Sequence, residues 1–241
     1  MAKLVYRVVS ACGALGYGFS RESLQKALEG RIDAVISDAG SMDAGPYYLG
    51  TGTEYFEREA VKADFRHMVE AGERIDGPVI LGSCGMAGGN RNLDWMIDVA
   101  KEVFDELGVK DRTVAVIRSE LDPASVIREF RAGALRSTGA DPELDAAALE
   151  ESTIVGQMGV HPLITALEGG AKYVLAGRWR WFAPSTASPR RTRTSSRTAC
   201  SRSRISASTA RRGRKADPPG RGMRTSASRA TRATWTIARC P

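Results

Sequence analysis

The stretch PVILGSCGMAGGN, residues 78–90, decides how this chain folds. It begins with a short apolar run that is typical of a buried strand and continues as a loop rich in glycine. It ends at Asn90, a residue type that often caps a helix. Apolar residues then recur at helical spacing up to Gly108, which is placed to end the helix. The stretch therefore predicts one strand–loop–helix unit of a parallel sheet.

The same alternation of apolar runs and helical patterns continues on both sides of this unit. Further strands are expected at residues 3–11, 33–37, 112–117 and 172–176. Helices are expected at residues 20–28, 54–75, 90–107 and 162–167, and after the pairs Asp122-Pro123 and Asp141-Pro142. Within residues 54–75, the apolar residues near helical spacing are Phe56, Ala60, Ala63, Met68 and Ala71. We predict an α/β fold with a mainly parallel open sheet of about five strands, flanking helices and Rossmann-like βα repeats.

The charge of the chain changes abruptly at Arg178. Residues 1–177 contain 18 Lys and Arg against 27 Asp and Glu, whereas residues 178–241 contain 17 against 1. The second part has no Leu and no Val, so it cannot bury enough apolar surface to offset the entropy of an ordered chain. We therefore expect one α/β core domain over residues 1–177 and a disordered Arg/Ser-rich tail over residues 178–241.

Three explanations of this basic tail compete. The first is a solvated linker, which the high Arg content and the scattered Trp179, Trp181 and Trp235 argue against. Segments rich in Arg and Ser can track the phosphates of a nucleic acid by charge alone, which would make the tail a nucleic-acid-binding arm. Alternatively, the reading frame slips near Arg178, because GC-rich codons read out of frame yield Arg, Ser, Thr, Ala, Pro and Gly. The acidic domain shows no basic groove or aromatic ladder, so nucleic-acid binding is the weaker interpretation and an out-of-frame tail is favoured.

Glycine-rich loops follow the first three strands, at residues 13–19, 38–50 and 82–90. Loops at the carboxyl ends of parallel strands meet at one edge of the sheet, where glycine lets N–H groups approach an anion. We expect a phosphate, a CoA pyrophosphate or a carboxylate to bind there. The expected substrate-binding residues in these loops are Gly16, Tyr17, Gly18, Gly40, Ser41, Tyr47, Tyr48, Ser83, Gly85, Gly88 and Gly89.

Asp38 and Asp43 are the candidate catalytic residues. Two carboxylates in one loop suit acid–base chemistry or a hard metal ion, and capping of turns explains them equally well. Asp38 also lies 20 residues after Gly18, where an acid that binds a ribose would stand, although the glycine spacing is not the usual dinucleotide pattern. The four cysteines and two histidines show no ligand spacing, so no metal site is predicted. His67 is expected to lie on the surface.

Several motifs together resemble the acyclic terpene utilisation (AtuA-like) family over residues 4–178. They are LGYGF at 15–19, DAGS at 38–41 with Asp43 and GPYYLG at 45–50, GS at 82–83 with Gly85 and AGG at 87–89, QMGV at 157–160 with Pro162, and VLAGR at 174–178. The resemblance implies a bacterial cytoplasmic protein that takes part in the breakdown of acyclic terpenoid or branched carboxylic acids, and the motif that ends at Arg178 adds this residue to the substrate-binding set. Family members continue into further globular sequence, so the core domain is expected to be truncated.

We therefore expect a cytoplasmic enzyme or enzyme subunit that binds a small carboxylated or CoA-linked substrate at the glycine-rich loops. The alternatives are a non-catalytic nucleotide- or ligand-binding α/β module and nucleic-acid binding through the tail. The cofactor stays open between a CoA-linked substrate and a nucleotide. No membrane partner is expected, because no run of about 18 apolar residues occurs. A homo-oligomer and a hetero-oligomeric subunit both remain open.

Overall fold

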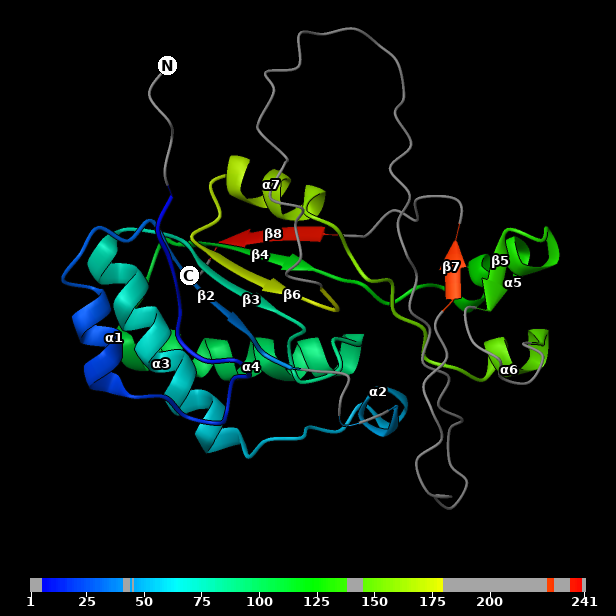
Figure 1. The fold of residues 1–241 in the computed structure, drawn as a ribbon, viewed down its shortest axis with the longest axis horizontal. Coiled ribbons are helices and arrows are strands. Elements are labelled where there is room, and N and C mark those ends of the chain that lie inside the picture. Colours follow the sequence, from blue (N-terminus) through cyan, green and yellow to red (C-terminus); the bar gives the residue numbers. More distant parts are fainter. Residues whose placement is uncertain are drawn as a thin grey trace, which may run out of the picture.

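The computed structural model describes residues 6–40, 44, 46–137, 145–179, 225–227 and 235–239. Five parallel strands form its main sheet, in the order β1-β2-β3-β6-β4, and β8 is antiparallel beside β4 at the edge (Figure 1). The strands are β1 (Val8–Ser10), β2 (Ala34–Asp38), β3 (Val79–Gly82), β4 (Thr113–Ile117), β6 (Tyr173–Ala176) and β8 (Trp235–Arg239). The α/β fold with a mainly parallel sheet and flanking helices is confirmed.

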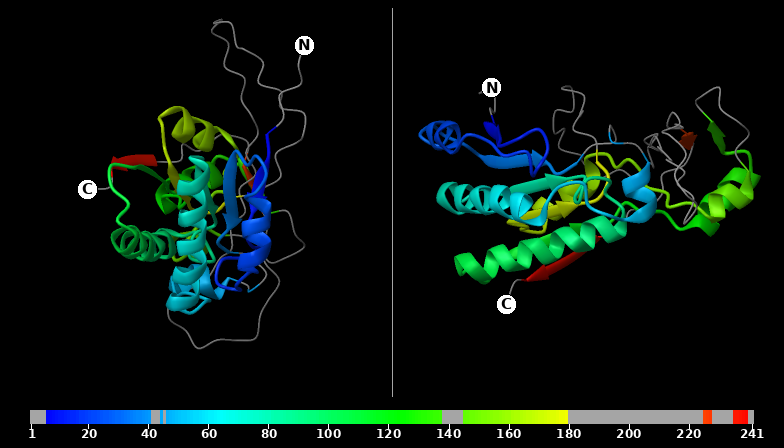
Figure 2. Two further views of the ribbon diagram at one scale, coloured as in Figure 1. Left: turned by 90° about the vertical axis from the view of Figure 1, so that its left-hand side faces the viewer. Right: turned by 90° about the horizontal axis from the view of Figure 1, so that it is seen from below.

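Helices cover both faces of the sheet. Three of them lie on one face: α1 (Arg21–Ala27), α3 (Arg58–Ile75) and α4 (Asn90–Leu107). Helix α7 (His161–Glu168) packs on the other face, against β4 and β6 (Figure 1). Figure 2 shows α3 and α4 side by side when the molecule is seen from below, and ion pairs such as Lys62–Glu106 (2.7 Å) join them.

Side chains of successive residues in each strand point to opposite faces of the sheet, as the pleat requires. In β3, Val79 and Leu81 belong to the larger core under α1, α3 and α4, whereas Ile80 belongs to the core under α7. Trp179 is only 4% exposed and packs in this second core. The packed part of the chain therefore continues to Trp179, two residues past the boundary expected at Gly177.

A smaller unit extends beyond the carboxyl ends of the strands (Figure 1). It contains α5 (Pro123–Arg131), α6 (Ala146–Glu150) and the antiparallel pair of β5 (Leu135–Ser137) with β7 (Thr225–Ala227). Its own apolar cluster includes Val126 and Leu149. The short helix α2 (Tyr47–Thr51) lies between this unit and the main sheet.

Among the described residues, two expected helix caps are confirmed and one is wrong. Ser20 caps α1 and Asp122 caps α5, as expected. Asn90 was expected to cap α4, but the cap position is Gly89, whose extended backbone begins the helix without a side-chain hydrogen bond. The expected cap pair Asp141-Pro142 lies outside the described residues, and α6 begins later, with Asp145 accepting the N–H of Ala148 at 2.6 Å.

The expectation of a disordered tail falls largely outside the described residues. Of residues 180–241, the structure describes two segments, and both are strands. Strand β8 pairs with β4, where Ala115 lies opposite Ile237, and β7 pairs with β5.

Candidate functional site

The loops after β2, β3 and β6 meet at the carboxyl edge of the sheet. The N–H of Ala39 donates to the carbonyl of Gly82 at 2.7 Å, and the N–H of Met86 donates to the carbonyl of Ala39 at 3.2 Å. The N–H of Ser83 donates to the carbonyl of Gly177 at 2.9 Å. These hydrogen bonds bring together Asp38, Ser83 and Arg178, which lie far apart in the sequence.

Among the described residues of this edge, Asp38 has the carboxyl group with the most strongly shifted pKa. Burial raises the pKa of Asp38 to about 6, although three opposing effects lower it. These are hydrogen bonds from the N–H of Gly40 and the hydroxyl of Ser83, and the positive charge of Arg178. The N–H of Gly40 lies 3.2 Å from Oδ1 of Asp38. A carboxyl group that exchanges its proton near neutral pH is suited to act as a general acid or base.

Ser83 donates a hydrogen bond to Asp38 and is not placed to act as a nucleophile. Its side chain is fully buried, and its backbone has a φ of 51°, a left-handed conformation that is uncommon outside glycine. Cys84 is also fully buried, and burial raises the pKa of its thiol far above the usual value. A thiol with so high a pKa stays protonated, so Cys84 is not an activated nucleophile.

Arg178 is held at the edge by its own backbone. Its N–H donates both to Oγ of Ser119 at 2.6 Å and to the carbonyl of Gly88 at 3.2 Å, while the hydroxyl of Ser119 donates to the same carbonyl at 2.9 Å. Ser119 follows β4, so these bonds tie the end of β6 to the loops after β3 and β4. Sequence reasoning missed Ser119, which no motif singles out.

The glycines of the second and third loops are required by contacts within the protein. A Cβ on Gly40 would lie 2.0 Å from the carbonyl oxygen of Met86. A Cβ on Gly85 would lie 2.2 Å from the carbonyl oxygen of Asn92, and one on Gly88 would lie 2.4 Å from the nitrogen of Arg178. The expected close approach to these glycines therefore exists, but protein backbone makes it. These contacts alone require glycine at the three positions, and binding of a ligand by these loops stays a prediction.

The loop after β1 binds a carboxylate group of the protein itself. The N–H groups of Gly16 and Gly18 donate to Oδ2 of Asp64 on α3, at 2.8 and 3.0 Å. Asp64 is only 6% exposed. These N–H groups were expected to face a ligand, and the Asp64 carboxylate takes that place. Sequence reasoning missed Asp64 because a charged residue in a helix is usually assigned to the solvent side.

Aromatic rings form a continuous row beside the edge. Successive rings meet edge to face, with centroid separations of 4.6–5.3 Å, in the order Tyr17, Phe56, Tyr55, Tyr48 and Tyr47. Tyr17 is 69% exposed and Tyr47 is 55% exposed. The expected ligand contacts Tyr17, Tyr47 and Tyr48 thus belong to one aromatic surface, in which each ring packs on its neighbour.

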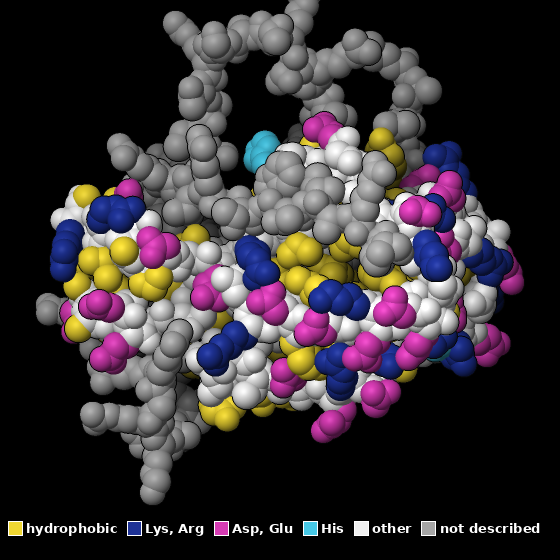
Figure 3. All heavy atoms as spheres, turned by 180° about the vertical axis from the view of Figure 1, so that it is seen from behind, with side chains coloured by type: hydrophobic (Ala, Val, Ile, Leu, Met, Phe, Trp, Pro, Cys, Tyr) yellow, Lys and Arg dark blue, Asp and Glu magenta, His cyan; other side chains and the backbone are white. Residues whose placement is uncertain are grey.

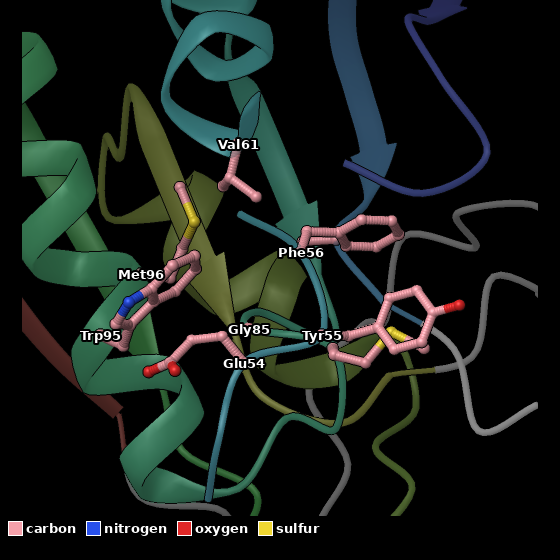
Figure 4. Close-up of a pocket in the computed structure, with 9 residues that line it drawn as sticks. Glu54, Tyr55, Phe56, Val61, Gly85, Trp95 and Met96 are labelled. Carbon is pink, nitrogen blue, oxygen red and sulfur yellow. The ribbon is translucent and has the colours of Figure 1, made fainter. Parts of the chain in front are cut away.

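A small crevice lies behind this row (Figure 4). The segment with Glu54, Tyr55 and Phe56 forms one wall, and Trp95 and Met96 of α4 form another. Its volume is about 10 Å3, which is about the space of one water molecule. A second cavity, of about 60 Å3, includes Gly89 among its lining residues.

The remaining candidates divide as follows. Ser41 and Asp43 lie outside the described residues, so the expected pairing of Asp43 with Asp38 stays a prediction.

His67 is partly buried and its Nδ1 lies 3.1 Å from a carboxylate oxygen of Glu70. Within the described residues, no group of three or more His, Cys, Asp or Glu side chains is arranged to hold a metal ion.

The described surface carries charges of both signs. In Figure 3, which shows the molecule from behind, Lys and Arg side chains are interspersed with Asp and Glu. None of the helices in the described ranges combines the length and the apolar character that crossing a membrane requires.

Comparison with known proteins gives no match for this chain among family models, curated proteins or solved structures.

Proposed function

We propose that this chain is an enzyme or enzyme subunit that acts on a small carboxylated or CoA-linked substrate at the carboxyl edge of the sheet. Asp38 is the acid–base group, and the charge of Arg178 attracts the carboxylate or phosphate of the substrate. The observation that carries the proposal is the position of Asp38, which is partly buried at the end of β2 and accepts the N–H of Gly40 at 3.2 Å. Burial there raises the pKa of Asp38 to about 6. Groups with strongly shifted pKa values in such positions are concentrated at functional sites.

The place of Asp38 in the fold supports the same proposal. In open α/β sheets, ligands bind outside the carboxyl ends of the strands, and Asp38 is the last residue of β2. The aromatic row that includes Tyr47 and Tyr48 offers apolar area next to this edge. A substrate with an apolar chain and a charged end group matches these two features together.

The resemblance to the AtuA-like family adds a substrate class to the proposal. On this basis we propose a cytoplasmic protein of acyclic terpenoid or branched carboxylic acid breakdown. We also propose that the reading frame slips near Arg178, which accounts for the change of composition. The nucleotide alternative has less support, because Asp64 occupies the N–H groups of Gly16 and Gly18 that would face a pyrophosphate.

The proposal is tested by incubating the full chain with a branched acyl-CoA and with the free acid, and by following product formation by mass spectrometry. Asp38→Asn should lower turnover by about 100-fold or more, the usual effect of removing a general acid or base. Its affinity for the substrate, measured by calorimetry, should change far less.

Asp98→Asn is the matched control, because Asp98 is an exposed carboxylate on α4 that pairs with Lys101 at 3.0 Å. It should leave turnover unchanged. Equal turnover in Asp38→Asn and the wild type would contradict the proposed role of Asp38.

A further inference from the structure

Arg178 lies two residues after the end of β6, where neighbouring segments hold the backbone by hydrogen bonds. The N–H of Gly177 donates to the carbonyl of Ile117 at 2.8 Å, and the carbonyl of Gly177 accepts the N–H of Ser83 at 2.9 Å. The carbonyl of Arg178 accepts the N–H of Met158 at 3.2 Å. These bonds join backbone groups, so they set the course of the chain whatever side chains these positions carry.

Ser119 adds a side-chain contact to these backbone bonds. Its Oγ accepts the N–H of Arg178 at 2.6 Å and donates to the carbonyl of Gly88 at 2.9 Å. The hydroxyl therefore uses both its proton and a lone pair, and it bridges Arg178 to the loop after β3. Alanine at position 119 would remove both bonds.

The hydroxyl of Ser119 is closely enclosed. Ser119 is only 3% exposed, and a Cβ on Gly177 would lie 2.4 Å from its Oγ. The hydroxyl has little freedom to turn towards other groups, and it does not reach the surface where a substrate would bind. Any effect of Ser119 on a substrate must therefore pass through Arg178.

The side chain of Arg178 begins from this fixed backbone. Its Nε is buried, and its positive charge acts on the carboxyl group of Asp38. A guanidinium binds a carboxylate or a phosphate through directed N–H groups, so its position decides how well the two match. A side chain that is already held in place also loses less conformational freedom on binding.

We propose that Ser119 is a positioning residue, whose hydroxyl holds Arg178 where the guanidinium binds the carboxylate or phosphate of the substrate. The inference rests on the proposed function, because it requires Arg178 to bind this group. Ser119 takes no part in proton transfer at Asp38. Its replacement should therefore weaken substrate binding and leave the catalytic step almost unchanged.

Steady-state kinetics of the full chain with a branched acyl-CoA separate these two effects. Ser119→Ala should raise KM by about 5- to 10-fold, the effect of losing one hydrogen bond, and change kcat by less than about 2-fold. Ser152→Ala is the matched control, because Ser152 is also buried and its Oγ donates to the carbonyl of Ala148 in the smaller unit. It should leave both constants unchanged.

Titration of Asp38 by 13C NMR gives a second measurement that needs no substrate. If Ser119→Ala lets the charge of Arg178 move away, the midpoint of Asp38 should rise above the wild-type value, as it should in Arg178→Gln. A merely structural role of Ser119 would instead admit water and lower the midpoint. The nearby thiols of Cys12 and Cys84 stay protonated in this range, because burial raises the pKa of both.

The double variant of Ser119→Ala and Arg178→Gln completes the test. Two changes that act through the same charge are not additive, so Ser119→Ala should cause no further rise once Arg178 is replaced. Ser119→Cys, whose thiol is a weaker hydrogen-bonding group, allows the same comparisons if Ser119→Ala does not fold.

Two results would overturn the inference. One is a wild-type KM in Ser119→Ala. The other is a midpoint of Asp38 that is unchanged or lower in Ser119→Ala, or that rises equally with and without Arg178, which would mean that Ser119 does not act through the guanidinium. Both can occur while the wild type turns over its substrate, whereas a wild type without turnover would contradict the proposed function itself.

Discussion

The carboxylate of Asp64 accepts the backbone N–H of Gly16 at 2.8 Å, across 48 residues of sequence. The same oxygen also accepts the N–H of Gly18 at 3.0 Å. A buried charge is stable only when hydrogen bonds replace its hydration, and these two N–H groups provide that replacement. Asp64 thus fixes the loop after β1 against α3.

Replacing Asp64 should destabilise the domain. Asp64→Ala leaves two N–H groups without an acceptor, so we expect the free energy of unfolding to fall by about 2–3 kcal/mol. Asp64→Asn keeps one acceptor oxygen and should cost less. Urea unfolding measures both. An unfolding free energy for Asp64→Ala equal to that of an exposed control such as Asp98→Ala would show that the loop does not depend on this carboxylate.

Glycine at position 40 should be required for folding and not for ligand approach. Gly40→Ala places a methyl group 2.0 Å from the carbonyl oxygen of Met86, which only a backbone shift can relieve. We expect a loss of about 3 kcal/mol or more, at the upper end of the cost of overpacking. Gly13→Ala meets no atom within 4 Å and serves as the control. Similar Tm values for the two variants would argue against the tight contact between these loops.

The pKa of Asp38 makes the stability of the domain depend on pH. The folded pKa of about 6 exceeds the unfolded value of about 3.9, so the folded state binds the proton more tightly. Stability is therefore highest below about pH 4 for this group and falls as the pH rises to about 6, by up to about 3 kcal/mol. Asp38→Asn should remove this contribution. Urea unfolding at pH 4.5 and 7.5 checks it, and an unchanged difference between these pH values in Asp38→Asn would contradict the shift.

Hydrophobic periodicity was sufficient to predict the sheet and most helices. The apolar runs at residues 78–81 and 172–176 are the central strands β3 and β6, and the caps Ser20 and Asp122 were identified by residue type alone. The pattern was less exact in α3, which begins at Arg58 instead of residue 54. Its buried side includes Asp64, whereas Ala63 is exposed. The hydrogen bond that Asp64 accepts from the loop after β1 outweighs the usual preference of a charged side chain for water.

The candidate site was predictable in its place and less so in its contacts. Parallel strands bring their carboxyl ends to one edge, so the convergence of the loops that hold Asp38 and Ser83 followed from the predicted parallel sheet. The groups that contact the glycines could not be inferred from the sequence. Glycine is required both where protein backbone approaches closely and where a ligand does. Ser119 carried no sequence signal, since its role comes from contacts between elements that are distant in the chain.

The coding DNA should reveal the origin of the basic tail. Translated in the other two forward frames from the codon for Gly177, one frame should give an acidic sequence that contains Leu and Val at strand or helix spacing. Two frames that are interrupted by stop codons, or are equally poor in Leu and Val, would show that the Arg/Ser-rich tail is a genuine product.

A direct titration of Asp38 tests the central claim, that a carboxyl group at the edge of the sheet exchanges its proton near neutral pH. The measurement is 13C NMR of the side-chain carboxyl groups in aspartate-labelled protein, with Asp38→Asn used to assign the signal. We predict a midpoint near pH 6 for Asp38. A midpoint near the ordinary value of about 4 would mean that Asp38 is an ordinary carboxylate at neutral pH, and it would contradict the proposed acid–base role.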